Sequence, residues 1–458
     1  MLFDNIDLTV LPEYIATTGR KGYSDHAKIR AFVVMKCECF SCVTDLLDYL
    51  QNNLLIAHYC GFNIMKPLPS YWTLERFIKK HKNELLKLVM QTQVKKLFDL
   101  GVLDTSFIAL DSTPISANTS QNNPKSFKKD KFKPENQPAS DKDCKLGVHT
   151  ASNQHDEKNY EFYWGYKNHI LVDCITGLPI YEMTTTADVA DSSVTLDILE
   201  KTNDFLSLKE CTFIGDKAYD VKKIYNTVKD FYEGECCIPI NKRNTKNPEK
   251  LPSGHLLCEA GLAMNKDGKT SDRGRTRQKF CCPFKNSKTA CCPCNHKNWN
   301  NGKKNRGCTK YVTIPDDYRL AIDRESLSFK KIYALRTEAE RYNARFKQTG
   351  QERAWVHSFN AVQNLNTIAH IALLAVAIAA TVTQSDYSVR CLKSVKRIAL
   401  AFFFHIFNIR CAFLAYSLLR CAFFSFFLIS FTICCLKCIR FALLCTCLGK
   451  YMVIISQH

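Results

Sequence analysis

The sequence predicts an α/β protein. A mixed-sheet catalytic core is interrupted by an insertion subdomain and preceded by an all-α, helix-turn-helix-like N-terminal domain. Apolar residues recur at three- and four-residue spacing through the first 100 residues, which is the period of a helix. Between residues 105 and 240, apolar runs of strand length alternate with helical runs, which indicates a mixed sheet. From 241 to 327 this periodicity is lost and Gly, Pro, Asn, Cys and Lys dominate.

The composition favours a folded protein with a polyanionic partner. The 458 residues allow two to four domains at about 100–200 residues each. A content of 46% hydrophobic and 23% charged residues excludes a disordered chain. The net charge of +19 favours nucleic acid first and an anionic membrane second. Asp4 and Asp7 stand where a signal peptide carries cationic residues, so we expect a cytoplasmic protein in which the 24 cysteines are reduced or metal-bound.

The N-terminal region, residues 1–100, is predicted to consist of short helices. One helix is expected to begin near Trp72, with Ser70 as its N-cap after two prolines. Lysines and an arginine flank this helix, and short helices with a basic face are typical of helix-turn-helix DNA readers. A plain helical bundle with solvated lysines is the alternative.

The core elements follow from apolar runs and their bounding turns. A buried strand is predicted at 105–116, and paired strands are predicted around the turn at Thr176-Gly177. A lysine-rich loop is expected at 119–145. The remaining predictions are strands at 163–172, 178–183, 210–216 and 236–240, and helices at 187–205, 221–231, 330–348 and 361–380.

Three acids stand where they can meet. Asp111 and Asp216 end predicted strands, and Glu340 lies on the helix that follows the insertion. Two Mg²⁺ ions about 3.5–4 Å apart need hard oxygen ligands from different rigid elements, which two strands and a helix can supply. For any one acid taken alone, a solvated or turn-capping carboxylate is the alternative.

The helix that carries Glu340 has a more specific pattern. Tyr333, Arg336, Glu340 and Lys347 follow the spacing Y-x2-R-x3-E-x6-K, which places them along one stripe of a helix. A carboxylate for metal, two cations for phosphates and an aromatic ring suit work on a phosphodiester. The alternative is a salt-bridged surface helix, because Arg336 and Glu340 are an i,i+4 pair.

Residues 1–385 resemble the DDE transposases of bacterial insertion sequences, in the branch marked by this Y-R-E-K signature. The resemblance rests on five segments: Leu110–Thr113, Gly215–Tyr219, Tyr333–Lys347, Gly22–Ser24 and Pro69–Tyr71. It implies an RNase H-like core in which Asp111, Asp216 and Glu340 bind Mg²⁺, with Mn²⁺ as a substitute. It also implies that the DNA contacts are Tyr333, Arg336, Lys347 and Tyr219.

The activity implied by the resemblance is DNA transposition. The enzyme would bind the terminal inverted repeats of its element, cut the 3′ end with water, and join the freed 3′-OH to target DNA. A homodimer in the synaptic complex is expected from the family. The alternatives are a host nuclease with an RNase H-like core, and a DNA-binding or membrane-associated protein that has lost catalysis.

Seven cysteines lie between residues 258 and 308, within the insertion. Cys258, Cys282, Cys294 and Cys308 form a candidate structural zinc site, because four soft ligands suffice for tetrahedral Zn²⁺. The substitutes are Cys291, Cys292 and His296. Buried or free thiols are the alternative. Basic residues around the cluster predict a surface that faces DNA, and Trp299 is either a base-stacking residue or a small core anchor.

The chain thus divides into four parts: 1–100, a helical DNA-binding domain; 101–240 plus 328–385, the catalytic core; 241–327, the insertion; and 386–458, a hydrophobic tail. Residues 387–458 carry nine basic residues and no acidic one. The tail could be a membrane anchor or a segment packed on the core. We favour an aberrant extension past the usual stop, because arginines and lysines interrupt its apolar runs.

Overall fold

The structure is a computed structural model of the chain, and residues 1–392 form one compact unit. The residues that it describes are 2–13, 22–126, 129–152, 158–241, 255–272, 275–286, 307–313, 318–383 and 389–390. The predicted tail, 386–458, lies almost wholly outside the described residues, as do Cys291, Cys292, Cys294, His296 and Trp299.

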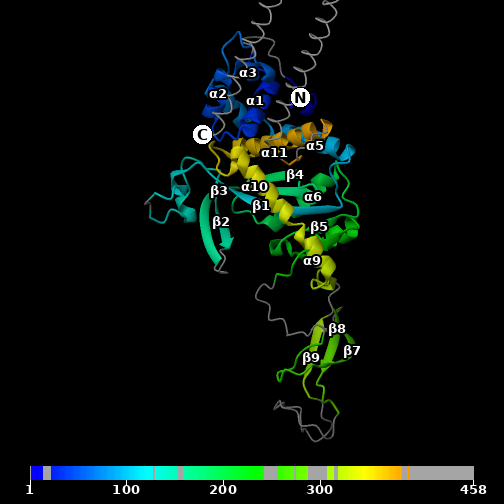
Figure 1. The fold of residues 1–458 in the computed structure, drawn as a ribbon. Coiled ribbons are helices and arrows are strands. Elements are labelled where there is room, and N and C mark those ends of the chain that lie inside the picture. Colours follow the sequence, from blue (N-terminus) through cyan, green and yellow to red (C-terminus); the bar gives the residue numbers. More distant parts are fainter. Residues whose placement is uncertain are drawn as a thin grey trace, which may run out of the picture. The chain divides into compact units, whose positions relative to one another are not determined.

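A six-stranded mixed sheet forms the centre of this unit (Figure 1). Its strands are β1 (Phe107–Ser116), β2 (Lys145–Ser152), β3 (Lys158–Asp173), β4 (Pro179–Thr186), β5 (Thr212–Ile214) and β6 (Glu235–Cys237). The order is β2-β3-β1-β5-β6, and β4 also pairs with β3. The β1–β3, β2–β3 and β3–β4 pairs are antiparallel, whereas β1–β5 and β5–β6 are parallel. The predicted mixed α/β fold is confirmed.

The β3–β4 hairpin turns where the sequence predicts it. Gly177 takes a positive φ of 69°, and the Asp173 carboxylate accepts hydrogen bonds from the Ile175 N–H (2.7 Å) and the Thr176 side chain (2.5 Å). Strand β2 was not predicted. It pairs with the far half of β3, where both strands carry polar residues and the alternation that marks a strand is weak.

Helices connect and cover the strands. They are α6 (Asp191–Asn203), η4 (Lys217–Tyr219), α7 (Lys222–Asn226), the π-helical turn η5 (Thr227–Phe231) and α8 (Tyr318–Ala321). Three short 3₁₀ turns are η1 (Phe3–Asn5), η2 (Ser120–Asn122) and η3 (Pro134–Asn136).

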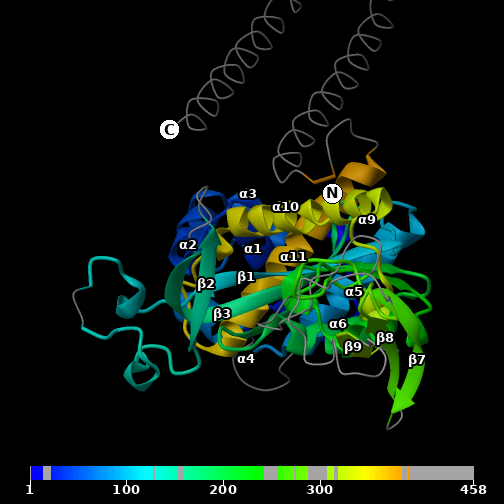
Figure 2. The ribbon, with the colours of Figure 1, turned by 90° about the horizontal axis from the view of Figure 1, so that it is seen from below.

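The single helix predicted at 330–348 is wrong: the structure divides it into α9 (Leu327–Ala334), α10 (Thr337–Phe346) and the π-helical turn η6 (Lys347–Gln351). Between α9 and α10 the backbone makes tighter i→i−3 bonds, from the N–H of Leu335 and of Arg336. The Thr337 hydroxyl also donates to the carbonyl of Ala334, which stabilises the break. The two helices still run nearly in line (Figure 2).

Five helices precede the sheet: α1 (Asp25–Cys37), α2 (Val43–Asn52), α3 (Leu54–Cys60), α4 (Tyr71–Lys80) and α5 (Asn83–Asp99). Residues of the predicted apolar period, such as Ile29, Leu46 and Leu74, are fully buried. Ser70 stands at the N-cap of α4, as predicted. Its hydroxyl lies 3.1 Å from the Thr73 hydroxyl and caps no backbone N–H.

Helix α11 (Phe359–Val382) packs against α1, α4 and α5, and also against β4. Figure 1 accordingly shows it between the N-terminal helices and the sheet. In the described part of the chain it alone is long and apolar enough to cross a membrane, but 89% of its most apolar window is buried in the protein. Such burial explains an apolar helix as a core element.

Buried polar pairs fix α11 and η6 in this core. The Lys36 ammonium donates to the Gln351 side chain (2.9 Å), whose amide donates to Asn366 (2.8 Å). The Asn83 amide donates to the Thr367 hydroxyl (2.8 Å). The Lys36–Gln351 and Asn83–Thr367 pairs join elements that are far apart in sequence, and Gln351–Asn366 joins η6 to the helix that follows it. Together they specify how α1, α5 and α11 pack.

The insertion contains a three-stranded antiparallel sheet that was not predicted. Its strands are β7 (Asn265–Asp272), β8 (Arg275–Cys281) and β9 (Thr309–Thr313), in the order β7-β8-β9. A small core of its own is made by Leu256, Cys258, Met264 and Phe280. The strands escaped prediction because they are rich in Lys, Arg and Thr, with few apolar residues to reveal a two-residue period.

Candidate active site

Asp111 and Asp216 lie at the same level of two adjacent parallel strands. In the β1–β5 register Ala109 pairs with Ile214, and each acid stands two residues beyond its member of that pair. Neighbouring strands run about 4.8 Å apart, and residues two apart share a face. The topology therefore brings the two predicted acids together where β5 ends beside the middle of β1. Asp111 does not end its strand as predicted, because β1 continues to Ser116 in its pairing with β3.

The local backbone at Asp216 turns sharply after β5. Asp216 is the N-cap of η4, and its Oδ1 accepts a hydrogen bond from the Ala218 N–H at 2.7 Å. At Gly215 an added Cβ would lie 3.0 Å from the Tyr219 ring, so a side chain there would press on that ring. Asp216 remains partly exposed, which leaves its carboxylate accessible.

Helix α10 brings the third acid. It packs against β1 and β3 and carries Glu340, whose side chain is 50% exposed. One turn later, the Asn343 side-chain amide donates to Asp111 Oδ2 at 2.9 Å. This contact, which the sequence did not predict, ties α10 to β1 beside the acids. Local patterns carry no signal for a pair separated by 232 residues.

The acids influence one another. The pKa of Asp111 is raised to about 6, mainly by burial and also by the nearby carboxylates of Asp216 and Glu340, while the Ser112 N–H and the Arg336 guanidinium act in the opposite direction. A cluster of acids that repel one another in a partly buried site is an environment that a cation would stabilise.

Three of the four signature residues are in contact, because Arg336 lies between Tyr333 and Glu340 and touches both. The Arg336 guanidinium lies 5.7 Å from the centre of the Tyr333 ring and 2.5 Å from Glu340 Oε1. Lys347 lies beyond the end of α10, where its Nζ is 4.0 Å from Glu352 Oε1. The structure therefore joins Tyr333, Arg336 and Glu340 and places Lys347 farther along, beside a cavity.

Tyr219 requires a correction. The sequence predicts a DNA contact, but the side chain is 1% exposed and its ring packs edge to face on Phe213 at 6.2 Å. Burial also raises its pKa well above the usual value. In this structure Tyr219 is a core residue of the turn after β5, and in the described part of the chain its buried hydroxyl has no hydrogen-bond partner.

The donor set suits a divalent ion by its chemistry. Asp111, Asp216 and Glu340 offer hard carboxylate oxygens from three separate elements, as Mg²⁺ prefers. Among the described residues, however, no three His, Cys, Asp or Glu side chains are grouped closely enough to hold a metal ion. Glu340 is held by Arg336, so metal binding would require its carboxylate to turn away from that guanidinium.

The described cysteines of the insertion lie partly together. Cys308 packs against the small core that contains Cys258, and the Cys282 N–H donates to the Cys308 carbonyl at 3.0 Å. The Sγ of Cys258 accepts a hydrogen bond from the Leu262 N–H at 3.4 Å. Cys294, the fourth predicted ligand, lies outside the described residues.

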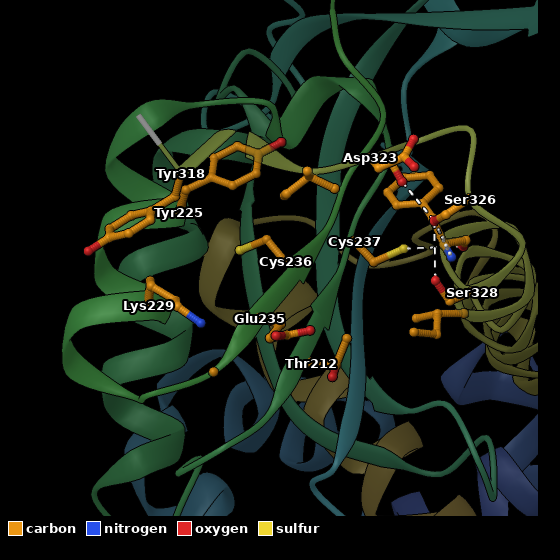
Figure 3. A pocket seen from close by; sticks show the side chains of 14 residues that line it. Thr212, Tyr225, Lys229, Glu235, Cys236, Cys237, Tyr318, Asp323, Ser326 and Ser328 are labelled. Atoms are coloured by element: carbon orange, nitrogen blue, oxygen red, sulfur yellow. Dashed lines mark hydrogen bonds between the residues drawn. The ribbon is translucent and has the colours of Figure 1, made fainter. Parts of the chain in front are cut away.

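A separate cavity of about 460 Å³ borders the edge strand β6 (Figure 3). Tyr225, Lys229 and Tyr318 form one wall, and Figure 3 shows Asp323, Ser326 and Ser328 on the opposite side. The Cys237 thiol donates to the Phe329 carbonyl at 3.6 Å. None of the three predicted acids lines this cavity, so it is not part of the candidate active site.

Comparison with known proteins gives a family match and similar solved structures. A family model described as "Transposase DDE domain" matches residues 103–375. A solved synaptic complex of piggyBac transposase with hairpin DNA is similar at 10% identity, over 86% of this chain and 74% of that chain, with a TM-score of 0.38. A Mos1 transposase paired-end complex is similar at 12% identity, over 48% of this chain and 61% of that one, with a TM-score of 0.16. No curated protein matches the chain.

Proposed function

Because the chain belongs to the family of DDE transposase domains, we propose that it cuts and joins DNA strands at Asp111, Asp216 and Glu340. The observation that carries this proposal is the meeting of two acids on adjacent parallel strands with a helix that bears the third. Register aligns Asp111 with Asp216, and Asn343 joins the helix of Glu340 to Asp111.

The three carboxylates would hold Mg²⁺, or Mn²⁺ in its place. When bound, such an ion polarises a phosphoryl oxygen and lowers the pKa of water. The protein would keep the scissile phosphate beside these carboxylates, with Asp111 and Asp216 fixed by β1 and β5. Water would displace the 3′ oxygen first, and the freed 3′-OH would then attack the target strand.

The signature residues would bind the DNA backbone. Arg336 is held against Tyr333, so its guanidinium is oriented before a phosphate arrives. Lys347, about 36% exposed, would contact a second phosphate of the transposon end. The bound DNA would comprise the terminal inverted repeats and the target, in a synaptic homodimer.

The N-terminal helices would supply further DNA contacts. Helix α4 exposes Trp72, Arg76 and Lys80, which are spaced four residues apart and so form one stripe. Trp72 is 65% exposed. An exposed aromatic ring beside two basic side chains suits the DNA backbone and bases better than it suits a solvated helix.

The insertion would be stabilised by zinc at Cys258, Cys282, Cys308 and Cys294. Cys308 packs against the core that contains Cys258, and the Cys282 N–H donates to the Cys308 carbonyl. Three of the four cysteines therefore belong to one small subdomain, which supports this proposal. A protein that acts on DNA in this way would be cytoplasmic and nucleoid-associated.

Cleavage of defined DNA distinguishes this function from its alternatives. A transposase should cut a labelled duplex that contains the element's terminal inverted repeat at the repeat boundary, and should then join that 3′ end to a second DNA. A host nuclease with the same core would cut unrelated duplex equally well and join nothing. A chain that has lost catalysis would bind without cutting.

A further inference from the structure

We propose that Lys347, Arg353 and Trp355 form a subsite for one unstacked nucleotide of the DNA strand that passes the acids. The proposal rests on the proposed transposase function. It concerns residues beyond the signature helix and adds a base contact to the phosphate contacts already described.

The subsite is a cavity of about 500 Å³ at the far end of β1. That volume lies within the range of about 300–1,000 Å³ that small-ligand pockets occupy. Its walls include Ser116 from β1, Asn122, and the segment that follows α10 with Lys347, Arg353 and Trp355. Most of these groups are polar or charged, as a nucleotide requires.

The backbone of this segment is fixed to the sheet. The Ser116 N–H donates to the Glu352 carbonyl (3.2 Å), and the Ala354 N–H donates to the Ser116 carbonyl (2.8 Å). Gly350 takes a φ of +83°, and an added Cβ would lie 3.0 Å from the Phe40 carbonyl oxygen. Arg353 and Trp355 therefore stand on a segment that is held in place before a ligand binds.

The side chains present a stacking surface and an unused donor. The Arg353 guanidinium lies 4.6 Å from the centre of the Trp355 ring, and the indole is 41% exposed. The Nε of Arg353 is buried and has no hydrogen-bond partner among the described residues. An exposed indole can stack on a base, while the guanidinium can donate to its phosphate.

The local charge is favourable but not uniform. Lys347 and Arg353 are cationic, and Glu352 lies 4.0 Å from Lys347 Nζ. The Glu352 side chain is 76% exposed, so it can turn into solvent when a phosphate takes its place. The two cations leave a net positive charge at the cavity.

The spacing suits a strand that leaves the active site. Lys347 follows Glu340 by seven residues, about 10 Å along a helix, and Ser116 follows Asp111 by five, about 17 Å along a strand. Those distances correspond to about three to five stacked nucleotides. A neighbouring cavity of about 370 Å³ shares Ser116 and Lys347 and continues towards Phe162.

An abasic-site scan tests this subsite directly. Terminal-repeat DNA is prepared with one base removed at each position near the cleavage point, and binding is measured by fluorescence anisotropy. We expect wild type to lose about 10-fold in affinity at one or two positions, about three to five nucleotides from that point. Trp355→Ala should bind the intact DNA about 10-fold more weakly than wild type does. Its affinity should be the same for every abasic DNA as for the intact DNA.

Two further variants control for folding and for general loss of aromatic surface. Trp355→Phe retains a stacking ring and should restore the position-dependent response. Phe231→Ala removes a ring that is 70% exposed and lines neither cavity, so it should behave as wild type. Arg353→Ala should lower the slope of log affinity against log salt by about 1.

The outcomes separate the subsite from the proposed function. A wild type that cleaves the repeat but responds equally to every abasic position would overturn the subsite and leave the transposase function standing. If wild type does not cleave, single-stranded thymidine oligonucleotide still tests the cavity. Equal affinity of wild type and Trp355→Ala for it would overturn the subsite.

Discussion

The amide of Asn343 donates to Asp111 Oδ2 at 2.9 Å and so joins helix α10 to strand β1. Asn343 stands one turn after Glu340, so the same contact sets the distance between the helix of the third acid and the first acid. The side-chain oxygen of Asn343 is buried, and no described residue donates a hydrogen bond to it. We regard Asn343 as a positioning residue for the acid cluster.

Replacing Asn343 by Ala should slow metal-dependent cleavage by about 10–100-fold, because partners that orient metal-binding groups typically carry that effect. The loss should appear in kcat and in the Mg²⁺ concentration for half-maximal rate, with DNA affinity unchanged. Arg341→Ala, on the same helix with a side chain 66% exposed, is the matched control. Equal losses in both variants would contradict the positioning role.

Arg336 should compete with metal for Glu340, since the two side chains lie 2.5 Å apart. Arg336→Gln should therefore lower the Mg²⁺ concentration needed for half-maximal binding while it weakens DNA binding by about 10-fold, the effect of losing a charge-assisted bond of about 1.5 kcal/mol. Isothermal titration with metal, then with DNA, measures both. A variant that needs more Mg²⁺ would contradict the competition.

Parts of this architecture could be predicted from the sequence because local patterns encode them. Strand β1, the β3–β4 hairpin and helix α11 each have an apolar period that burial in the core explains. Strands β2 and β7–β9 contain few apolar residues and lack that signal.

The three candidate acids could be named from the sequence, whereas the contacts around them could not. Register between β1 and β5 depends on partners far apart in sequence, as does the Asn343–Asp111 bond. The sequence predicts that Tyr219 contacts DNA. In the structure its ring packs against the turn after β5, and it can lie close to the backbone of Gly215 because that residue has no side chain.

The buried Lys36 should make stability depend on pH. Burial lowers its pKa from 10.5 to about 7, so between those values the unfolded chain binds more protons than the folded one. The free energy of unfolding should therefore rise with pH above 7, by about 1.4 kcal/mol per pH unit, and be insensitive to Lys36 below 7.

Chemical denaturation at pH 7 and 8.5 measures this effect in wild type and in Lys36→Met. The difference between the two proteins should change by about 2 kcal/mol across that interval. Met has a similar volume and no charge. The pH dependence that all other groups contribute to the free energy of unfolding is therefore the same in both proteins and cancels in the difference. A difference that stays constant would show that Lys36 keeps an ordinary pKa.

The insertion should contain about one zinc ion per chain. Cys258→Ser should lose that zinc and unfold the insertion, because Cys258 belongs to its small core. Cys174→Ser, a buried cysteine of the sheet region, should retain the metal. The zinc content of the purified full-length proteins is measured by mass spectrometry. Wild-type protein that contains no zinc would contradict the predicted zinc site.

The most direct test of the central claim is Mg²⁺-dependent cleavage of a terminal-repeat duplex by wild type, Asp111→Asn, Asp216→Asn and Glu340→Gln. These nearly isosteric changes remove one negative charge each. We predict cleavage by wild type and a loss of about 10³-fold or more in every variant, equivalent to several kcal/mol of transition-state stabilisation, with DNA binding retained. Cleavage by any of the three variants at the wild-type rate would contradict the assignment of that acid.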